Sequence, residues 1–277
     1  MIEAVNIIDR FIRTNHLPHI WCPGCGNGIV LNALIRAIDN TKLKKEEVVV
    51  AAGIGCSGRA AGYLNFCGFQ PTHGRAIPFG TGVKIANPDL KVIVITGDGD
   101  CTSIGGNHFI HAARRNIDLT VIVFNNSNYG MTGGQYSSTT PLGAKTSTSP
   151  YGHIEDSFDI CELAKTAGAT YIARSTTYHI LLTINYLERA IKHKGFSIVE
   201  VICACPTLFG RFNKLGNATQ MMLQQKEQAI QFKKAQKMSS EDLKDKIIIG
   251  ELYENIQKPE YTDAYQKVID KAQKEEN

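Results

Sequence analysis

The sequence predicts an α/β protein built on a parallel sheet that helices cover on both faces. Several segments are continuously apolar, as strands are when both faces of their sheet are buried. Segments with helical spacing of apolar residues separate these strands, which is the order of elements typical of a parallel sheet. The chain has 277 residues, 43% of them hydrophobic, and is therefore long enough to bury such a core.

The expected elements alternate along the chain from about residue 28 to residue 200. Apolar runs predict strands over 47–55, 90–100, 119–126, 170–174 and 197–205. Apolar residues at helical spacing predict helices over 29–39, 108–116, 158–168 and 178–194. Before these elements, we expect a short amphipathic helix that ends at Pro18.

The composition changes near residue 215, after which Gln and Lys become frequent. We therefore divide the chain into a main domain over 1–215 and a helical extension over 216–277. The extension is expected to hold one amphipathic helix, over about 218–237, and a polar tail. We expect it to pack on the main domain or on a partner subunit.

Charge and cysteine content limit the classes of function. The formal net charge of +4 is too small to indicate a nucleic-acid partner. No apolar run is long enough to span a membrane, and the N-terminus does not read as a secretory signal. The eight cysteines are then expected in the reducing cytoplasm, where paired cysteines indicate metal or redox chemistry more than structural disulfides.

Polar loops follow two of the predicted strands, at the sheet edge where ligands of parallel sheets bind. Asp98, between Gly97 and Gly99, follows one strand, and Asn126 follows the next strand 28 positions later. A carboxylate and an amide oxygen suit Mg²⁺, and the glycines let the backbone approach a phosphate. Either loop alone is explained by a simple turn. Together they predict a site for a diphosphate held through a divalent ion.

The stretch CPGCGNG places Cys22 and Cys25 three positions apart in a turn rich in Gly and Pro. Cys56 follows the first strand, and Cys203 and Cys205 lie at the end of the last one. Four thiolates suit a [4Fe–4S] cluster, although a zinc ion could use the same ligands. A redox disulfide between the close pair is the third interpretation, and it leaves the distant cysteines without a role.

Five motifs of the chain resemble those of the beta subunit of 2-oxoacid:ferredoxin oxidoreductases. They are WCPGCGNG, GIGCSGR, HGRAIPFGTGVKIANP, GDGDCTSIGGNHFIHAARRN and NNSNYGMTGGQYS. They occur in the same order over about residues 20–215 and include the thiamine-diphosphate signature, Gly-Asp-Gly followed by Asn-Asn. The loop YGMTGGQ and the segment GGNHFIHAARRN are most similar to the 2-oxoglutarate type. Pyruvate and branched-chain 2-oxoacids are the alternative substrates.

The resemblance implies a diphosphate-half, thiamine-diphosphate-binding fold in which Asp98, Asn126 and the Asn128 carbonyl hold Mg²⁺. Met131 would support the bent cofactor. The residues implied to contact the cofactor all follow strands: Gly55, Cys56, Ser57, Gly97, Asp98, Gly99, Asp100, Asn126, Asn128, Gly130, Met131 and Thr132. We also expect Gly80 to Gly82 to open a helix and form a second wall of the pocket.

The resemblance also implies that the [4Fe–4S] ligands are Cys22, Cys25, Cys56 and Cys205. Cys205 is preferred over Cys203 because Pro206 and Thr207 follow it, as in the family. The other cysteines are expected to be small buried residues: Cys67, Cys101, Cys161 and Cys203.

Two catalytic residues are expected near the cluster and the cofactor. Arg59 follows Cys56 by three positions, and the resemblance implies that it faces the carboxylate of the 2-oxoacid. His73 lies in the motif THGRA and is a candidate for substrate binding or proton handling. The alternative for each is a structural role, as an interface arginine or as a histidine that fixes a loop.

The activity implied is CoA-dependent oxidative decarboxylation of 2-oxoglutarate to succinyl-CoA and CO₂, with electrons passing through the cluster to ferredoxin. Residues 1–215 would be the catalytic domain. In the family, the activating glutamate lies on an alpha (or alpha/gamma) subunit, so this chain alone is expected to be inactive. A cluster-free thiamine decarboxylase or carboligase half would leave the four cysteines unused. A non-catalytic cluster-binding module would leave Asp98 and Asn126 unused.

Overall fold

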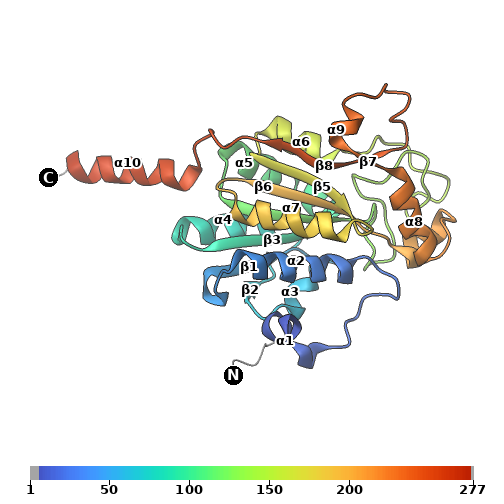
Figure 1. Ribbon diagram of the computed structural model, residues 1–277, viewed down its shortest axis with the longest axis horizontal. Coiled ribbons are helices and arrows are strands. Elements are labelled where there is room, and N and C mark those ends of the chain that lie inside the picture. Colours follow the sequence, from blue (N-terminus) through green and yellow to red (C-terminus); the bar gives the residue numbers. More distant parts are fainter. Residues whose placement is uncertain (1–5, 276–277) are drawn as a thin grey trace.

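Eight strands form one sheet in the computed structural model, which describes residues 6–275 (Figure 1). Their order is β2-β1-β3-β4-β6-β5-β8-β7, and neighbours are parallel except for the antiparallel pair β5–β8. The strands are β1 (Val48–Ala52), β2 (Cys67–Phe69), β3 (Lys91–Gly97), β4 (Leu119–Asn125), β5 (Tyr171–Thr176), β6 (Ser197–Ile202), β7 (Ala229–Gln231) and β8 (Ile247–Glu254).

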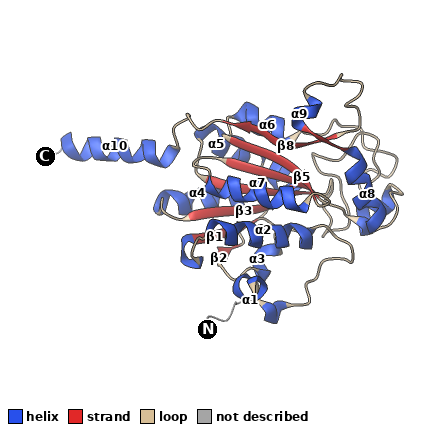
Figure 2. Cartoon of the chain, in the orientation of Figure 1, coloured by secondary structure: helices blue, strands red, loops and turns tan. Residues whose placement is uncertain are grey.

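Helices cover both faces of this sheet, which confirms the predicted fold class (Figure 2). One face packs against α1 (Ile7–Phe11), α2 (Asn27–Thr41), α3 (Ala60–Tyr63) and α7 (Ile180–Lys192). The other face packs against α4 (Ala76–Ala86), α5 (Gly106–Arg115) and α6 (Ile160–Ala167). All seven residues of β4 are buried, because successive side chains enter the two cores in turn.

The strand order places a topological switch point between β1 and β3. The chain leaves β1 toward β2 on one side, whereas β3 and β4 continue the sheet on the other side. The loops that follow β1 and β3 therefore diverge, and a crevice opens between them at the carboxyl ends of the strands. The predicted loops at Gly55–Ser57 and at Gly97–Asp100 lie at this point.

We expected a helical C-terminal extension, but the structure shows that it also contains strands. The single helix predicted over 218–237 is wrong, because α8 (Ala218–Gln228) is followed by β7 and by α9 (Phe232–Ala235). The polar tail includes β8, which pairs with β5 and extends the main sheet. The last element, α10 (Tyr261–Glu275), projects away from the sheet (Figure 1).

The N-terminal helix also differs from its prediction. Helix α1 ends at Phe11 rather than at Pro18, because Ile12 leaves the helix to form a β-bridge with Leu64. A short 3₁₀ turn follows over Thr14–His16. Residues 1–5, which belong to the predicted helix, lie outside the described residues. Within residues 6–275, no helix combines the length and the apolar character needed to cross a membrane.

Candidate active site

The two predicted polar loops meet at the carboxyl edge of the sheet. Asp98 follows the last residue of β3, and Asn126 follows the last residue of the neighbouring strand β4. The backbone N–H of Asn126 donates to Asp98 Oδ1 at 3.4 Å. The adjacency expected from the 28 positions between these residues is therefore confirmed.

Asp98 is almost completely buried, and one of its oxygens is fixed by two hydroxyl groups. Ser137 Oγ and Thr139 Oγ1 donate to Asp98 Oδ2 at 2.5 and 2.6 Å. Burial raises the pKa of Asp98 above its usual value, although these hydrogen bonds act in the opposite direction. The carboxylate thus has a fixed orientation, with Oδ1 directed toward the Asn126 loop.

Three potential ligand atoms lie close together: Asp98 Oδ1, the end of the Asn126 amide and the Asn128 carbonyl oxygen. The end of the Asn126 amide lies 2.7 Å from the Asn128 carbonyl oxygen and 3.3 Å from Asp98 Oδ1. With its nitrogen inward, the amide donates to both oxygens. With its oxygen inward, three oxygens face one another without a proton between them, which a divalent cation stabilises. The residues present therefore fit Mg²⁺.

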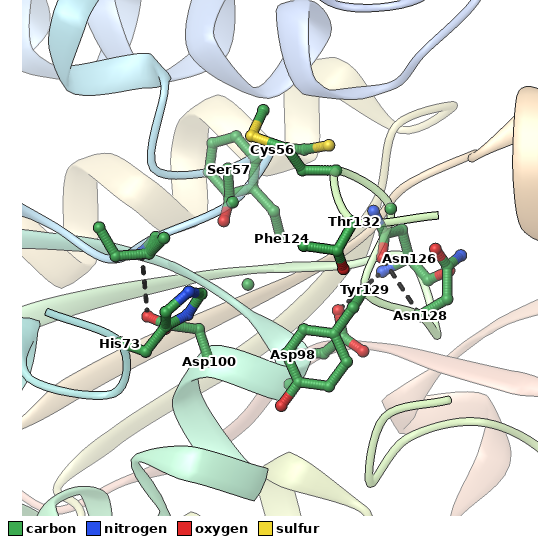
Figure 3. A pocket seen from close by; sticks show the side chains of 16 residues that line it. Cys56, Ser57, His73, Asp98, Asp100, Phe124, Asn126, Asn128, Tyr129 and Thr132 are labelled. Atoms are coloured by element: carbon green, nitrogen blue, oxygen red, sulfur yellow. Dashed lines mark hydrogen bonds and ion pairs between the residues drawn. The ribbon is translucent and has the colours of Figure 1, made fainter. Parts of the chain in front are cut away.

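A narrow crevice of about 40 Å³ lies beside these atoms (Figure 3). All the residues predicted to contact the cofactor line it, together with His73 and with three residues that were not predicted, Ile54, Phe124 and Tyr129. A Cβ added at Gly99 would lie 2.4 Å from the Tyr129 ring, so only glycine fits at this point. The structure brings the predicted residues together, and their contact with a cofactor stays a prediction.

Asp100 differs from Asp98, because its carboxylate joins two loops to the end of β3. It accepts from the N–H of Gly74 at 2.9 Å, from Thr96 Oγ1 at 3.1 Å and from the N–H of Ile54 at 3.4 Å. His73 Nδ1 lies 3.4 Å from Asp100 Oδ1, while half of the His73 side chain is exposed to solvent. Asp100 thereby links His73 to the floor of the crevice.

Arg59 is exposed just before α3 and lines neither the crevice nor the cysteine cavity described below. Its role in substrate binding stays a prediction. The expectation for Gly80 to Gly82 is wrong, because these residues lie inside α4 rather than at its start. Gly80 packs closely against β3, where an added Cβ would lie 3.2 Å from Val94 and 3.3 Å from Val92.

The four predicted cluster ligands, Cys22, Cys25, Cys56 and Cys205, line one cavity of about 320 Å³. Two hydrogen bonds hold the parts of this cavity together. The N–H of Gly26 donates to the Ala204 carbonyl at 3.1 Å, and Trp21 Nε1 donates to the Cys56 carbonyl at 2.7 Å. The first bond joins the C-x-x-C turn to the end of β6, and the second joins it to the loop after β1.

The four thiols supply the donor set of a [4Fe–4S] cluster. Within residues 6–275, no three His, Cys, Asp or Glu side chains converge as a single-ion site requires. A [4Fe–4S] cluster instead binds each thiolate at a separate iron. Burial raises the pKa of Cys25 to about 11 and that of Cys56 to about 12, and the neighbouring cysteines add to both shifts. The cluster would therefore have to displace protons when it binds.

Cys203 does not line this cavity, since it is buried and its thiol donates to the Val201 carbonyl at 3.2 Å. The choice of Cys205 stays a prediction, which the cavity supports. Cys101, Cys161 and Cys203 are buried as expected, whereas Cys67 is exposed on the edge strand β2. The expectation that Cys67 is buried is wrong, because an edge strand of three residues leaves its side chains uncovered.

The crevice and the cysteine cavity adjoin each other. Cys56, Asn126, Gly130 and Met131 line both spaces. A Cβ added at Gly130 would lie 3.4 Å from Cys56 Sγ, so the thiol and the backbone of the Asn126 loop are close together. A group bound in the crevice would thus lie next to a cluster bound by the thiols.

Comparisons with known proteins agree with this geometry. Residues 49–201 match the family model of the thiamine pyrophosphate enzyme, C-terminal TPP binding domain. The chain is 50% identical to 2-oxoglutarate synthase subunit KorB of Methanocaldococcus jannaschii, over 96% of this chain and 98% of that protein. The chain belongs to the KorB family of 2-oxoacid:ferredoxin oxidoreductase beta subunits.

More distant relatives extend this family beyond the KorB name. The chain is 44% identical to 2-oxoacid:ferredoxin oxidoreductase 2, subunit beta, of Aeropyrum pernix, over 68% of this chain and 60% of that protein. It also superposes on a solved structure with a TM-score of 0.85 and 29% identity, covering 96% of this chain and 90% of that one. That structure is 2-oxoglutarate:ferredoxin oxidoreductase from Magnetococcus marinus with 2-oxoglutarate, coenzyme A and succinyl-CoA bound.

In this KorB family member, the sequence did not reveal the side chains that orient the predicted metal ligand Asp98 and the loop of Cys56. Ser137 and Thr139 were missed because they lie in a long loop without a periodic pattern. The run of four hydroxyl residues from Ser137 to Thr140 was the available signal. Trp21 lies in one of the five motifs, but only the structure shows that its indole N–H fixes the loop that carries Cys56.

Proposed function

We propose that this chain is the beta subunit of a CoA-acylating 2-oxoacid:ferredoxin oxidoreductase that acts on 2-oxoglutarate. The observation that carries the proposal is the contact between two spaces, a crevice with metal-ligand oxygens and a cavity with four thiols. Relatives that cover nearly the whole chain are named 2-oxoglutarate synthase subunits, which favours 2-oxoglutarate over other 2-oxoacids.

The chain's own residues would bind and orient two resident cofactors. Asp98, Asn126 and the Asn128 carbonyl would hold Mg²⁺ and, through it, the diphosphate of thiamine diphosphate. When bound, thiamine diphosphate supplies the carbanion and the electron sink that decarboxylation of a 2-oxoacid needs. Met131, which lines both spaces, would support the cofactor on the side that faces the thiols.

Cys22, Cys25, Cys56 and Cys205 would hold a [4Fe–4S] cluster that accepts electrons one at a time and transfers them to ferredoxin. Coenzyme A would take the acyl group. All eight cysteines are free, which suits a protein that works in the reducing cytoplasm.

His73 and Arg59 would act on the substrate side of the crevice. His73 lines the crevice with its Nδ1 3.4 Å from Asp100 Oδ1, a position suited to substrate binding or proton handling. Arg59 is exposed and could bind a substrate carboxylate only at a surface that a second chain completes.

The site requires an alpha (or alpha/gamma) partner subunit. Thiamine enzymes use a glutamate against the aminopyrimidine ring, and no glutamate among the described residues lines the crevice. The partner would supply this glutamate and the second wall of the substrate pocket. We expect the isolated chain to show no turnover.

The test is an anaerobic assay of the complex of this chain with its alpha partner. Thiamine diphosphate, Mg²⁺, coenzyme A and oxidised ferredoxin are supplied, and ferredoxin reduction is followed with 2-oxoglutarate, pyruvate and 2-oxoisovalerate. We expect reduction with 2-oxoglutarate and its loss in Asp98→Ala. Preference for another acid would overturn the substrate, and no reduction from a brown, thiamine-loaded complex would overturn the reaction.

A further inference from the structure

A buried carboxylate lies inside the sheet below the metal-ligand loops. Glu200, on the central strand β6, has only 2% of its surface exposed. Arg174 stands opposite it on β5 and donates to Glu200 Oε2 from Nε at 2.6 Å. A buried charge of this kind is costly, and its ion pair alone is weak evidence for a gain in stability. The contact of the other carboxylate oxygen, Oε1, suggests a different role for Glu200.

Glu200 Oε1 accepts a hydrogen bond from Asn125 Nδ2 at 2.7 Å. Asn125 is the last residue of β4 and directly precedes Asn126, which we place in the metal site. An amide can present either its nitrogen or its oxygen, and a carboxylate accepts only from the nitrogen. Glu200 therefore decides which way the Asn125 amide faces.

The orientation of Asn125 controls the groups around Asp98. Asn125 Oδ1 accepts from the N–H of Ser127 at 3.1 Å, which shapes the turn that carries Asn126. It also lies 3.1 Å from Thr139 Oγ1, the hydroxyl that donates to Asp98 Oδ2 at 2.6 Å. Because Thr139 has a single hydroxyl proton, Asn125 Oδ1 and Asp98 Oδ2 compete for it. The link from Glu200 to the metal-ligand loop that does not depend on this proton is the hydrogen bond from Ser127 to Asn125.

We propose that Glu200 is a positioning residue for the divalent-metal site, acting through Asn125 on the turn after β4 and on Thr139. This inference rests on the proposed function, because it assumes that Asp98, Asn126 and the Asn128 carbonyl bind a divalent ion. Residues that orient metal ligands are worth about 10–100-fold in metal affinity. Arg174 also pairs with Asp159 at 2.5 Å, so its charge keeps a partner when Glu200 is changed.

The test compares Glu200→Gln with two further variants in the complete complex. A glutamine has the size of Glu200 but one acceptor oxygen, which cannot serve both Arg174 and Asn125. Asn125→Ala removes the link itself and provides a second route if Glu200→Gln does not fold. Glu251→Gln is the matched control, because Glu251 also pairs with an arginine and accepts from a hydroxyl, that of Tyr171 at 2.8 Å. Glu251 does not line the crevice.

Binding of Mn²⁺ in the presence of thiamine diphosphate is measured by electron paramagnetic resonance, together with iron content and thermal unfolding. We expect Glu200→Gln and Asn125→Ala to weaken Mn²⁺ binding by about 10–100-fold, with iron content unchanged. A higher Mg²⁺ concentration should restore ferredoxin reduction in these two variants. A purely structural defect would not be rescued in this way. Glu251→Gln should bind Mn²⁺ like the wild type.

Equal Mn²⁺ affinity in the wild type and in both network variants would overturn the inference and leave the proposed function intact. Loss of Mn²⁺ and iron together, with early unfolding and no rescue by Mg²⁺, would also overturn it. Wild-type binding without turnover on any 2-oxoacid would instead overturn the proposed reaction alone. A wild type that binds no Mn²⁺ would overturn both.

Discussion

The amino edge and the carboxyl edge of the sheet differ in whether their buried polar groups have hydrogen-bond partners within the chain. At the amino edge, the completely buried Asn116 uses both ends of its amide. Its Oδ1 accepts from Thr170 Oγ1 and from the N–H of Phe196, both at 2.8 Å, and its Nδ2 donates to the Pro259 carbonyl at 3.0 Å. Nearby, Asp118 Oδ2 pairs with the buried Lys84 Nζ at 2.6 Å. Asn116 and Asp118 thus find their partners within one chain.

The carboxyl edge leaves polar groups without partners in the part of the chain that the structure describes. Asn128 Oδ1 and both amide atoms of Asn27, beside the C-x-x-C turn, are buried and make no hydrogen bond. Four thiols also face one cavity with no cation among the protein side chains that line it. Buried polar atoms without partners are costly, so this edge stores free energy that a ligand can recover. The amino edge stabilises the fold, and the carboxyl edge is shaped for cofactors.

The largest effect should come from removing a thiol at the carboxyl edge. In Cys205→Ala, we expect the cluster to be lost and ferredoxin reduction to fall to background, because one iron loses its ligand. Cys203→Ala is the matched control, since its thiol lies two positions away but outside the cavity. Iron content and the visible absorption spectrum measure the outcome. The reverse result would show that the distal ligand is Cys203.

A substitution at the amino edge should lower the free energy of unfolding without changing cofactor binding. Among the described residues, Lys84→Met leaves Asp118 with Lys91 as its one ion-pair partner, and the Lys91 Nζ lies 3.7 Å away. We therefore expect a loss of about 3 kcal/mol in the free energy of unfolding. Urea unfolding measures this loss. Lys192→Met, which breaks an exposed pair with Glu188, should cost less than about 0.5 kcal/mol. Weaker Mn²⁺ binding in Lys84→Met would show that the two edges are coupled.

A smaller and more local effect is expected at the C-x-x-C turn. Gly24 has φ +77°, and a Cβ there would lie 2.3 Å from the Cβ of Ala218 in α8. Gly24→Ala should destabilise this turn by about 1–3 kcal/mol and speed the loss of iron to a chelator. Gly143→Ala is the control, because Gly143 has φ +78° but nothing lies within 4 Å of the position that its Cβ would take. If both variants lose iron equally fast, the contact with α8 has no role.

The smallest effect is a dependence of stability on pH at the amino edge. Burial lowers the pKa of His193 below its usual 6.5, while Glu254 and Asp118 act against this shift and Lys91 adds to it. As the pH falls below 6.5, His193 binds a proton in the unfolded chain but stays neutral in the folded chain. The free energy of unfolding therefore declines. The free energy of unfolding of the cofactor-free chain, measured from pH 8 to pH 5.5, should fall less in His193→Gln. Parallel curves would mean that other groups cause the decline.

Some parts of this structure were more predictable than others. The expected strands at 90–100 and 119–126 contain β3 and β4, because buried parallel strands leave a continuous apolar run. The helix predicted up to Pro18 failed because Ile12 pairs with Leu64, a contact 52 positions away that local periodicity cannot report. Glu200 was hidden inside an apolar strand, and only its neighbours on β4 and β5 explain it.

The sequence by itself determined the chemistry at the central strand ends and the alternation of strands and helices from about residue 28 to residue 200, because these depend on residue type and on short-range spacing. It placed Asp98, Asn126, Cys56 and Cys205 in loops at one edge of the sheet. Only the tertiary structure decided which oxygen of Asp98 is free, which distal cysteine lines the cavity and what orients Asn125. Those outcomes depend on contacts between segments that are distant in sequence, which side-chain packing and hydrogen bonding fix only when the sheet is assembled.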